Sequence, residues 1–177
     1  MKVICISGKA RHGKDTLANM MKDHLEQKGQ RVLIAHFGDL VKYICEKYFN
    51  WDGQKDERGR TLLQYVGTDV VRTQRPDYWT GFVMGVLQLF PNEWDYVLIP
   101  DCRFPNEVEC FRNNGFDSVN IRINRPDFVS NLTPEQLNHP SETAMDDYMY
   151  FDMYVINNGT LDDLYGKVEE IIEAIGG

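Results

Sequence analysis

The sequence predicts an α/β fold with a parallel β-sheet of five strands, and three observations support this prediction. Short, almost uninterrupted apolar runs recur along the 177-residue chain, as expected for strands that are buried on both faces. Segments with apolar residues at helical spacing separate these runs. Strands that alternate with helices form parallel sheets with right-handed crossovers, so we expect helices on both faces of the sheet.

The predicted strands are short runs rich in β-branched and apolar residues, each followed by polar residues or glycine. The first, KVICIS, ends at Gly8. The strands are expected at residues 2–7, 32–35, 96–99, 119–123 and 153–156.

The predicted helices each carry one apolar face and have recognisable ends. Gly29 and Gly115 are suited to C-terminal ends, because glycine adopts the left-handed conformation found there. Pro91 stops one helix, Pro105 begins another, and Thr160 is an N-cap for the last. The helices are expected at residues 17–25, 40–48, 62–70, 79–90, 105–115 and 161–175, with a turn at 50–53 and a polar stretch at 54–60.

Residues 126–150 form the least regular part of the chain. They carry prolines, asparagines and acids with little periodicity, which predicts a mobile flap or lid. No repeat, low-complexity segment or linker divides the sequence, so we predict a single domain over residues 1–177.

Composition excludes several classes of protein. The net charge of −8 argues against an extended nucleic-acid groove, which would be basic. No apolar stretch approaches the ~20 residues of a membrane span, and the short run at 3–6 is no secretory signal. The four cysteines lack metal-site spacing and predict free thiols in a reducing compartment. We expect a cytoplasmic protein that needs neither a nucleic-acid polymer nor a membrane, with a homodimer left open.

The strongest motif follows the first predicted strand, where Gly8, Gly13 and Lys14 fit the GxxxxGK phosphate loop. In this loop, backbone N–H groups surround a β-phosphate at a helix N-terminus, and the lysine reaches the β and γ oxygens. The loop predicts ATP as the ligand. Its candidate nucleotide-binding residues are Gly8, Lys9, Ala10, Arg11, His12, Gly13, Lys14, Asp15 and Thr16.

Three residues are candidates for binding Mg²⁺. Asp15 stands where a serine or threonine usually follows the lysine, and Thr16 comes one position later. Either oxygen suits a hard cation, and Asp15 could instead be an acid that stabilises the first helical turn. Asp101 follows the third predicted strand, where such sheets place an acid near the metal.

Phosphoryl transfer depends on positioning and on cations that screen the charges of both reactants. Ligands of open parallel sheets bind beyond the carboxyl ends of the strands. Arg103 and Arg125 are therefore candidate catalytic cations together with Lys14, and the acid Asp101 is a further candidate catalytic residue. The alternative for Arg103 is a surface ion pair with Glu107 or Glu109. These residues predict a kinase that transfers the γ-phosphoryl group of ATP to a small phosphorylated acceptor.

Several segments together resemble the phage-type deoxynucleoside monophosphate kinases of the P-loop kinase superfamily. The similarity covers nearly the whole chain, and GKDT, GTD and PDxR are its more specific motifs. The segments are SGKARHGKDT (7–16), Lys42, LLQYVGTDVVR (62–72), Tyr78-Trp79, DYVLIPDCRFPNEVE (95–109), Arg125-Pro126, HPSE (139–142) and VINNGTLDDLYGKV (155–168).

The resemblance implies a three-layer P-loop kinase fold with strand order 2-3-1-4-5 and an acceptor region at about residues 37–80. It implies a lid at about residues 126–145. By the same resemblance, adenine would pack against Asn157, Asn158 and Gly159. The implied acceptor-binding residues are Asp39, Lys42, Asp69, Arg72, Trp79 and Arg103.

The sequence departs from this family in a short, arginine-poor lid and a reduced acceptor region, which leave the choice of base open. His139 and Glu142 match a family pattern without an evident chemical role, and the start of a lid helix with Ser141 as its cap explains the same residues.

Three other classes were weighed. A regulatory GTPase is disfavoured, because Asn124-Arg125-Pro126-Asp127 lacks the lysine of the guanine-reading motif and no DxxG follows the third strand. A non-catalytic nucleotide-binding protein predicts loss of Lys14, Asp101 or Arg103, and all three are present. A phosphomevalonate kinase would need an acceptor site without a base, whereas an aromatic platform at Tyr78 and Trp79 favours a nucleobase.

Overall fold

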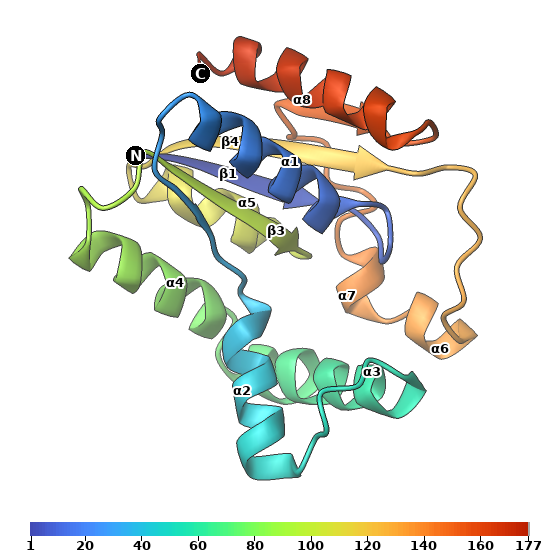
Figure 1. The fold of residues 1–177 in the computed structure, drawn as a ribbon. Helices are drawn as coiled ribbons and strands as arrows, with labels where there is room; N and C mark the ends of the chain where they lie inside the picture. Colours follow the sequence, from blue (N-terminus) through green and yellow to red (C-terminus); the bar gives the residue numbers. More distant parts are fainter. Residues whose placement is uncertain (177) are drawn as a thin grey trace.

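The computed structural model describes residues 1–176 and contains one five-stranded parallel sheet of order β2-β3-β1-β4-β5 (Figure 1). The predicted fold class and strand order are therefore confirmed. The central strand β1 and its neighbour β3 bury nearly all of their side chains, which explains their unbroken apolar character. The strands are β1 (Lys2–Ser7), β2 (Val32–Ile34), β3 (Tyr96–Cys102), β4 (Asp117–Asn124) and β5 (Met153–Ile156).

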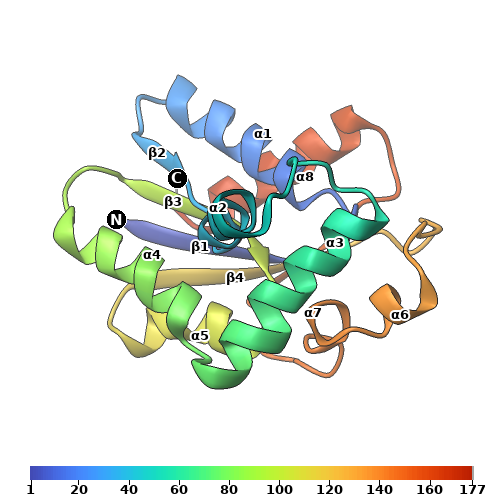
Figure 2. The same ribbon diagram turned by 90° about the horizontal axis from the view of Figure 1, so that it is seen from below.

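Helices cover both faces of the sheet and make two hydrophobic cores (Figure 2). Alternate side chains of β1 divide between them: Ile4 and Ile6 pack under α1 and α8, whereas Val3 and Cys5 pack against α2, α4 and α5. The helices are α1 (Lys14–Gln27), α2 (Gly38–Phe49), α3 (Glu57–Gln64), the π-helix η1 (Tyr65–Arg72), α4 (Tyr78–Leu89), α5 (Pro105–Asn113), α6 (Pro134–Leu137), α7 (Pro140–Thr143) and α8 (Leu161–Ala174).

The helix predicted at 62–70 is wrong in its bounds and in its type. It begins earlier, because the side chain of Asp56 caps α3 by accepting from the N–H of Gly59. It then widens into η1, a π-helix of the kind that is frequent at functional sites. Within η1, Gly67 lies against Val41 and its carbonyl accepts from Trp79 Nε1 at 2.8 Å. Tertiary contacts therefore set this geometry.

The segment predicted to be irregular contains two one-turn helices, α6 and α7, each beginning with proline. The prediction that Ser141 caps a lid helix is wrong. The cap is His139, whose Nδ1 accepts from the N–H of Ser141 at 3.2 Å. Gln136 is buried and donates to the carbonyl oxygen of Glu57, so the segment rests on α3 beyond the carboxyl ends of the strands (Figure 1).

The cysteines are all buried and free, as predicted. Within residues 1–176, no helix combines the length and apolar character that crossing a membrane would require.

Candidate active site

The loop between β1 and α1 has the shape that its two glycines permit. A Cβ atom on Gly8 would lie 2.5 Å from the carbonyl oxygen of Ile123. Gly13 has a φ of +98°, and a Cβ atom there would lie 2.4 Å from Asn157 Nδ2. Both positions therefore require glycine, and the loop passes directly against the ends of β4 and β5.

Hydrogen bonds hold the loop to these strand ends. Asn157 Nδ2 donates to the carbonyl oxygen of His12 at 3.0 Å, and the backbone N–H of Arg125 donates to His12 Nδ1 at 3.1 Å. Burial lowers the pKa of His12, which keeps its ring neutral and able to accept this bond. The sequence made His12 a candidate nucleotide-binding residue of the loop, and its ring also connects the loop to the end of β4.

Lys14 lies inside the loop with 6% of its surface exposed. Its Nζ donates to the carbonyl oxygens of Gly8 at 2.7 Å and Lys9 at 2.9 Å. Burial, assisted by the positive charge of Arg103, lowers the pKa of Lys14 to about 7. A bound anion would reverse this shift, because it stabilises the protonated amine.

We therefore expect ATP binding to be coupled to proton uptake. At about pH 8 Lys14 is mostly neutral in the free protein, and bound phosphates raise its pKa toward the ordinary value of 10.5, so nearly a full proton is taken up. Calorimetric titration with MgATP in two buffers of different ionisation enthalpy measures this proton. At about pH 6, where Lys14 is already protonated, the uptake should vanish; equal heats in both buffers at pH 8 would contradict the expectation.

Asp101 lies within β3, which extends three residues beyond the predicted 96–99. Its two carboxylate oxygens accept from the N–H groups of Phe37 at 3.1 Å and Gly38 at 2.8 Å, at the start of α2. Burial raises the pKa of Asp101, and the two amides oppose that shift. The residue thus joins the end of β3 to the N-terminus of α2.

Arg103 points from the end of β3 toward α7, and its side chain does not make the surface ion pair with Glu107 or Glu109 that was the alternative from the sequence. The guanidinium donates to the carbonyl oxygen of Ser141 at 3.2 Å and forms an ion pair with Glu142. The backbone N–H of Arg103 donates to Glu107.

Glu107 is a buried carboxylate that joins several residues of the site. It forms an ion pair with Arg72 and accepts from the N–H groups of Arg103 and Phe104. Burial raises its pKa to about 7, against the opposing effect of Arg72. Arg72 also lies 3.9 Å above the centre of the Phe104 ring. One acid therefore fixes Arg72 and the backbone at Arg103 together.

The remaining predicted acceptor residues are placed differently from one another. Lys42 pairs with Asp39 at 2.7 Å along one face of α2, and Asp69 pairs with His139 of the lid at 3.1 Å. Trp79 is 3% exposed and its indole N–H is used within the protein, so Trp79 offers no open aromatic platform. The ring packs α4 on η1 through this bond, and Trp79 also lines the hollow that contains Lys42, Arg72 and Arg103.

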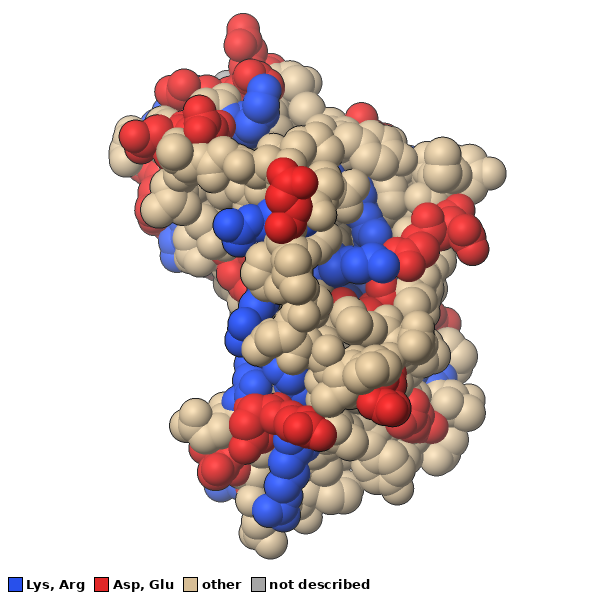
Figure 3. Space-filling model, turned by 90° about the vertical axis from the view of Figure 1, so that its right-hand side faces the viewer, with Lys and Arg blue, Asp and Glu red and all other residues tan. Residues whose placement is uncertain are grey.

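Two hollows lie in this region, one among residues that follow β2 and β3 and the other beside the phosphate loop. One, of about 250 Å³, is lined by Lys42, Arg72, Trp79, Arg103 and Glu142 among others, but by neither Asp39 nor Asp69. The other, of about 460 Å³, is lined by residues from the loop and from the ends of β4 and β5. These lining residues are Arg11, Gly13, Lys14, Asp15, Thr16, Arg125, Asn157, Gly159, Thr160, Leu161 and Leu164. Lys and Arg side chains run in a band down this face of the molecule (Figure 3).

The oxygen-bearing side chains near the loop suit a metal ion that takes some of its ligands from the protein and the others from a bound phosphate and water. Among residues 1–176, no three His, Cys, Asp or Glu side chains form a metal site by themselves. Mg²⁺ commonly takes one or two carboxylates and fills its remaining positions with phosphate oxygens and water. Asp15 and Thr16 are both exposed at the start of α1 and suit this mode, whereas both oxygens of Asp101 already accept from amides.

Two further charged groups, His36 and Arg122, belong to this region and were not predicted from the sequence. His36 Nε2 lies 3.2 Å from Asp15 and its Nδ1 lies 3.5 Å from Asp39, and the bond to Asp15 raises the pKa of His36. Arg122, buried in β4, donates to Ser7 Oγ at 3.0 Å. Their sequence signals were a histidine just after the second strand and an arginine inside an apolar strand.

The fold and the glycine-lysine loop define a P-loop kinase. Two solved kinases share the fold. Shikimate kinase from Aquifex aeolicus has a TM-score of 0.53 and 15% sequence identity, with 100% of both chains covered. APS kinase from Mycobacterium tuberculosis, in complex with AMPPNP and APS, has a TM-score of 0.51 and 13% identity, with 97% of both chains covered. Identity this low bears on the fold alone.

The chain belongs to the deoxynucleotide monophosphate kinase family, whose model matches residues 37–168. A relative from Acanthamoeba polyphaga mimivirus that provisionally carries the family name is 25% identical over 98% of this chain and 97% of its own length. The deoxynucleotide monophosphate kinase of Enterobacteria phage T4 is 29% identical over 66% of this chain. That alignment spans 46% of the phage enzyme.

Proposed function

We propose that this protein transfers the γ-phosphoryl group of ATP to a deoxynucleoside monophosphate, giving ADP and the corresponding diphosphate. The observation that carries the proposal is a pair of hollows, one lined by Lys14 and the phosphate loop and the other lined by Arg103 and further cations. Membership of the deoxynucleotide monophosphate kinase family supports the same reaction.

The donor side is the hollow between the loop and the ends of β4 and β5. The loop N–H groups at the start of α1 bind the ATP phosphates, and Lys14 turns from the carbonyl oxygens of Gly8 and Lys9 toward the β and γ oxygens. Asn157 and Gly159 line this hollow together with Arg125, and the turn that they form with Asn158 would pack against adenine. The fixed loop geometry orients the γ-phosphorus toward the second hollow.

The acceptor side is the hollow lined by Lys42, Arg72 and Arg103. These cations hold the monophosphate, and Asp39 and Asp69 orient the acceptor region through Lys42 and His139. An oxygen of the acceptor phosphate forms a bond to the γ-phosphorus while the bond to the β–γ bridging oxygen breaks, and ADP leaves with that electron pair. Lys14, Arg103 and Arg125 reduce the repulsion between the two anions.

Mg²⁺, held by Asp15 or Thr16 together with the ATP phosphates, would neutralise charge on the β and γ oxygens. Asp101 acts behind this position by fixing the start of α2 beside the acceptor. His36 bridges Asp15 and Asp39, which places one side chain between the donor and acceptor regions.

The proposal treats residues 1–177 as one domain, with the acceptor region at 37–80 and the lid at 126–145. It also places the protein in the cytoplasm, where ATP and nucleotides are available, acting on small nucleotides rather than on nucleic acid or membranes.

The test is an ADP-formation assay with ATP, Mg²⁺ and each deoxynucleoside monophosphate, each ribonucleoside monophosphate and mevalonate 5-phosphate. Turnover with at least one deoxynucleotide is expected, together with its loss when Mg²⁺ is omitted and in the Lys14→Ala variant. Turnover with mevalonate 5-phosphate alone would overturn the acceptor, and ATP binding without any turnover would overturn the enzymatic function.

A further inference from the structure

The lid brings a carboxylate directly onto the phosphate loop. Glu142 Oε2 accepts from the backbone N–H of Ala10 at 3.0 Å, and its other oxygen accepts from Arg103. The Glu142 side chain is only 7% exposed, so both contacts are enclosed. Ala10 belongs to the loop whose N–H groups bind anions. The carboxylate therefore takes a hydrogen-bond position that the loop can offer to a phosphate oxygen.

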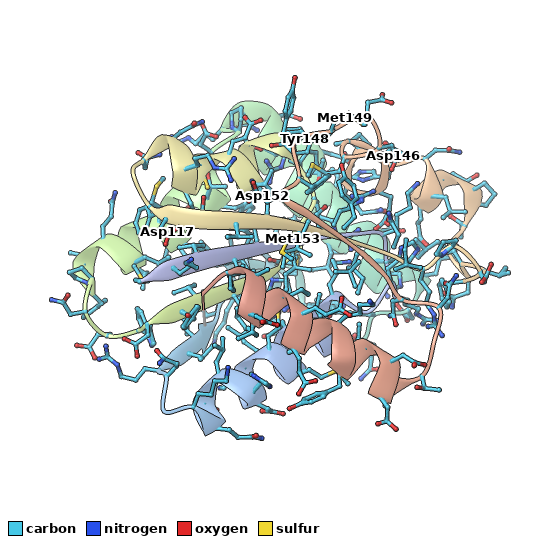
Figure 4. All side chains as sticks on the ribbon, turned by 90° about the horizontal axis from the view of Figure 1, so that it is seen from above. Asp117, Asp146, Tyr148, Met149, Asp152 and Met153 are labelled. Atoms are coloured by element: carbon cyan, nitrogen blue, oxygen red, sulfur yellow. The ribbon has the colours of Figure 1, made fainter. Side chains whose placement is uncertain are left out.

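A second acid from the adjoining segment contacts the same loop. Asp146 Oδ2 lies 2.9 Å from Lys9 Nζ, and its Oδ1 lies 3.4 Å from Arg122. Figure 4 shows the connection that carries Asp146 from the lid toward Asp152 and β5. Glu142 and Asp146 thus contact two consecutive loop residues, and both bring negative charge to a loop of the kind that binds phosphate.

A carboxylate and a phosphate cannot share this position. The single N–H of Ala10 aligns well with only one acceptor. A carboxylate and a phosphate that both approached this N–H would also repel each other strongly, because solvent is largely excluded there. Arg103 is held in the same way, because its NH1 group donates to Glu142 and to the carbonyl oxygen of Ser141.

We propose that Glu142 is an internal competitor of the ATP phosphates: docking of Glu142 on Ala10 and binding of ATP exclude each other, and ATP releases Arg103 from the lid. The proposal rests on the proposed function only in taking ATP as the donor. It gives a task to the HPSE segment, which the sequence left without one.

Two further lid contacts lie on the acceptor side. His139 Nε2 pairs with Asp69 of η1 at 3.1 Å, and Gln136 donates to Glu57 of α3. Displacing Glu142 therefore breaks the lid's contact with Ala10 while leaving the lid attached to the acceptor region. ATP binding then changes the position of Arg103 relative to the acceptor without detaching the lid.

The test compares equilibrium binding of Mg-AMPPNP to the wild type and to Glu142→Gln. Glutamine has the size of glutamate but lacks the charge that opposes phosphate. We expect the variant to bind the analogue about fivefold more tightly or better. Binding of adenosine, which has no phosphate, should be unchanged. Glu135→Gln, the same exchange at an exposed site of α6, is the matched control and should leave both affinities unchanged.

Equal or weaker binding of Mg-AMPPNP by Glu142→Gln would overturn the proposal, as would equal tightening for adenosine. If that variant does not fold, Asp146→Asn replaces it, with a smaller tightening expected and no tightening overturning the proposal. The kinase assay on the wild type is read separately. If the wild type shows no turnover but Glu142→Gln binds Mg-AMPPNP more tightly, only the proposed reaction is rejected. If the wild type turns over normally but Glu142→Gln binds Mg-AMPPNP more weakly, only the competitor role of Glu142 is rejected.

Discussion

Gly13→Ala is expected to reduce kcat/KM by about 10²-fold or more, because the phosphate loop cannot keep its shape. The φ of +98° is strained for alanine, and the new Cβ atom would lie 2.4 Å from Asn157 Nδ2. Relief requires either the loop or Asn157 to move. Movement of Asn157 breaks its hydrogen bond to the carbonyl oxygen of His12 and disturbs the region proposed to bind adenine.

Steady-state kinetics and Mg-AMPPNP binding measure this effect. Affinity for the analogue should fall with kcat/KM, since the loop is proposed to bind ground state and transition state alike. The matched control is Gly81→Ala on the exposed side of α4, where a Cβ atom meets nothing within 4 Å. That variant should be active and up to about 1 kcal/mol more stable. A Gly13→Ala enzyme with wild-type affinity for the analogue would contradict the assignment of the loop.

The parts of the fold that follow from local pattern were predictable from the sequence. The strands are short apolar runs, and the phosphate loop requires glycine at two positions whose spacing is visible in the chain. Caps such as Thr160, which accepts from the N–H of Asp163, are also local. These features depend on residues that are near one another in sequence, so a single sequence carries enough information to place them.

The parts that were missed depend on contacts between distant residues. Glu142 meets Ala10 across 132 positions, and His139 meets Asp69 across 70. The π-helical geometry of η1 goes with packing against Val41 and Trp79, which helical spacing alone does not reveal. Charged side chains also read as solvent-exposed in a sequence, so burial of Glu107 and Arg122 could be found only once the sheet and helices were assembled.

Glu107→Ala is expected to destabilise the protein by about 3–5 kcal/mol, because it leaves three hydrogen-bond donors without their acceptor. Arg72 would lose its buried partner, and the N–H groups of Arg103 and Phe104 would lose their acceptor. Glu107→Gln retains the volume and one acceptor oxygen, so a smaller loss of about 1–3 kcal/mol is expected. Denaturant unfolding measures both variants against Glu169→Ala, an exposed site on α8 where the change should be within about 0.5 kcal/mol.

The Gln variant also separates stability from catalysis. Because Glu107 fixes both Arg72 and the backbone at Arg103, its loss should loosen cations on the acceptor side while leaving the phosphate loop intact. At a temperature where Glu107→Gln is fully folded, we therefore expect kcat to fall and KM for the acceptor to rise, with Mg-AMPPNP affinity unchanged. Wild-type kinetics in the folded variant would show that Glu107 serves the fold alone, and a Glu107→Ala variant within 1 kcal/mol of wild type would show that its three donors find other acceptors.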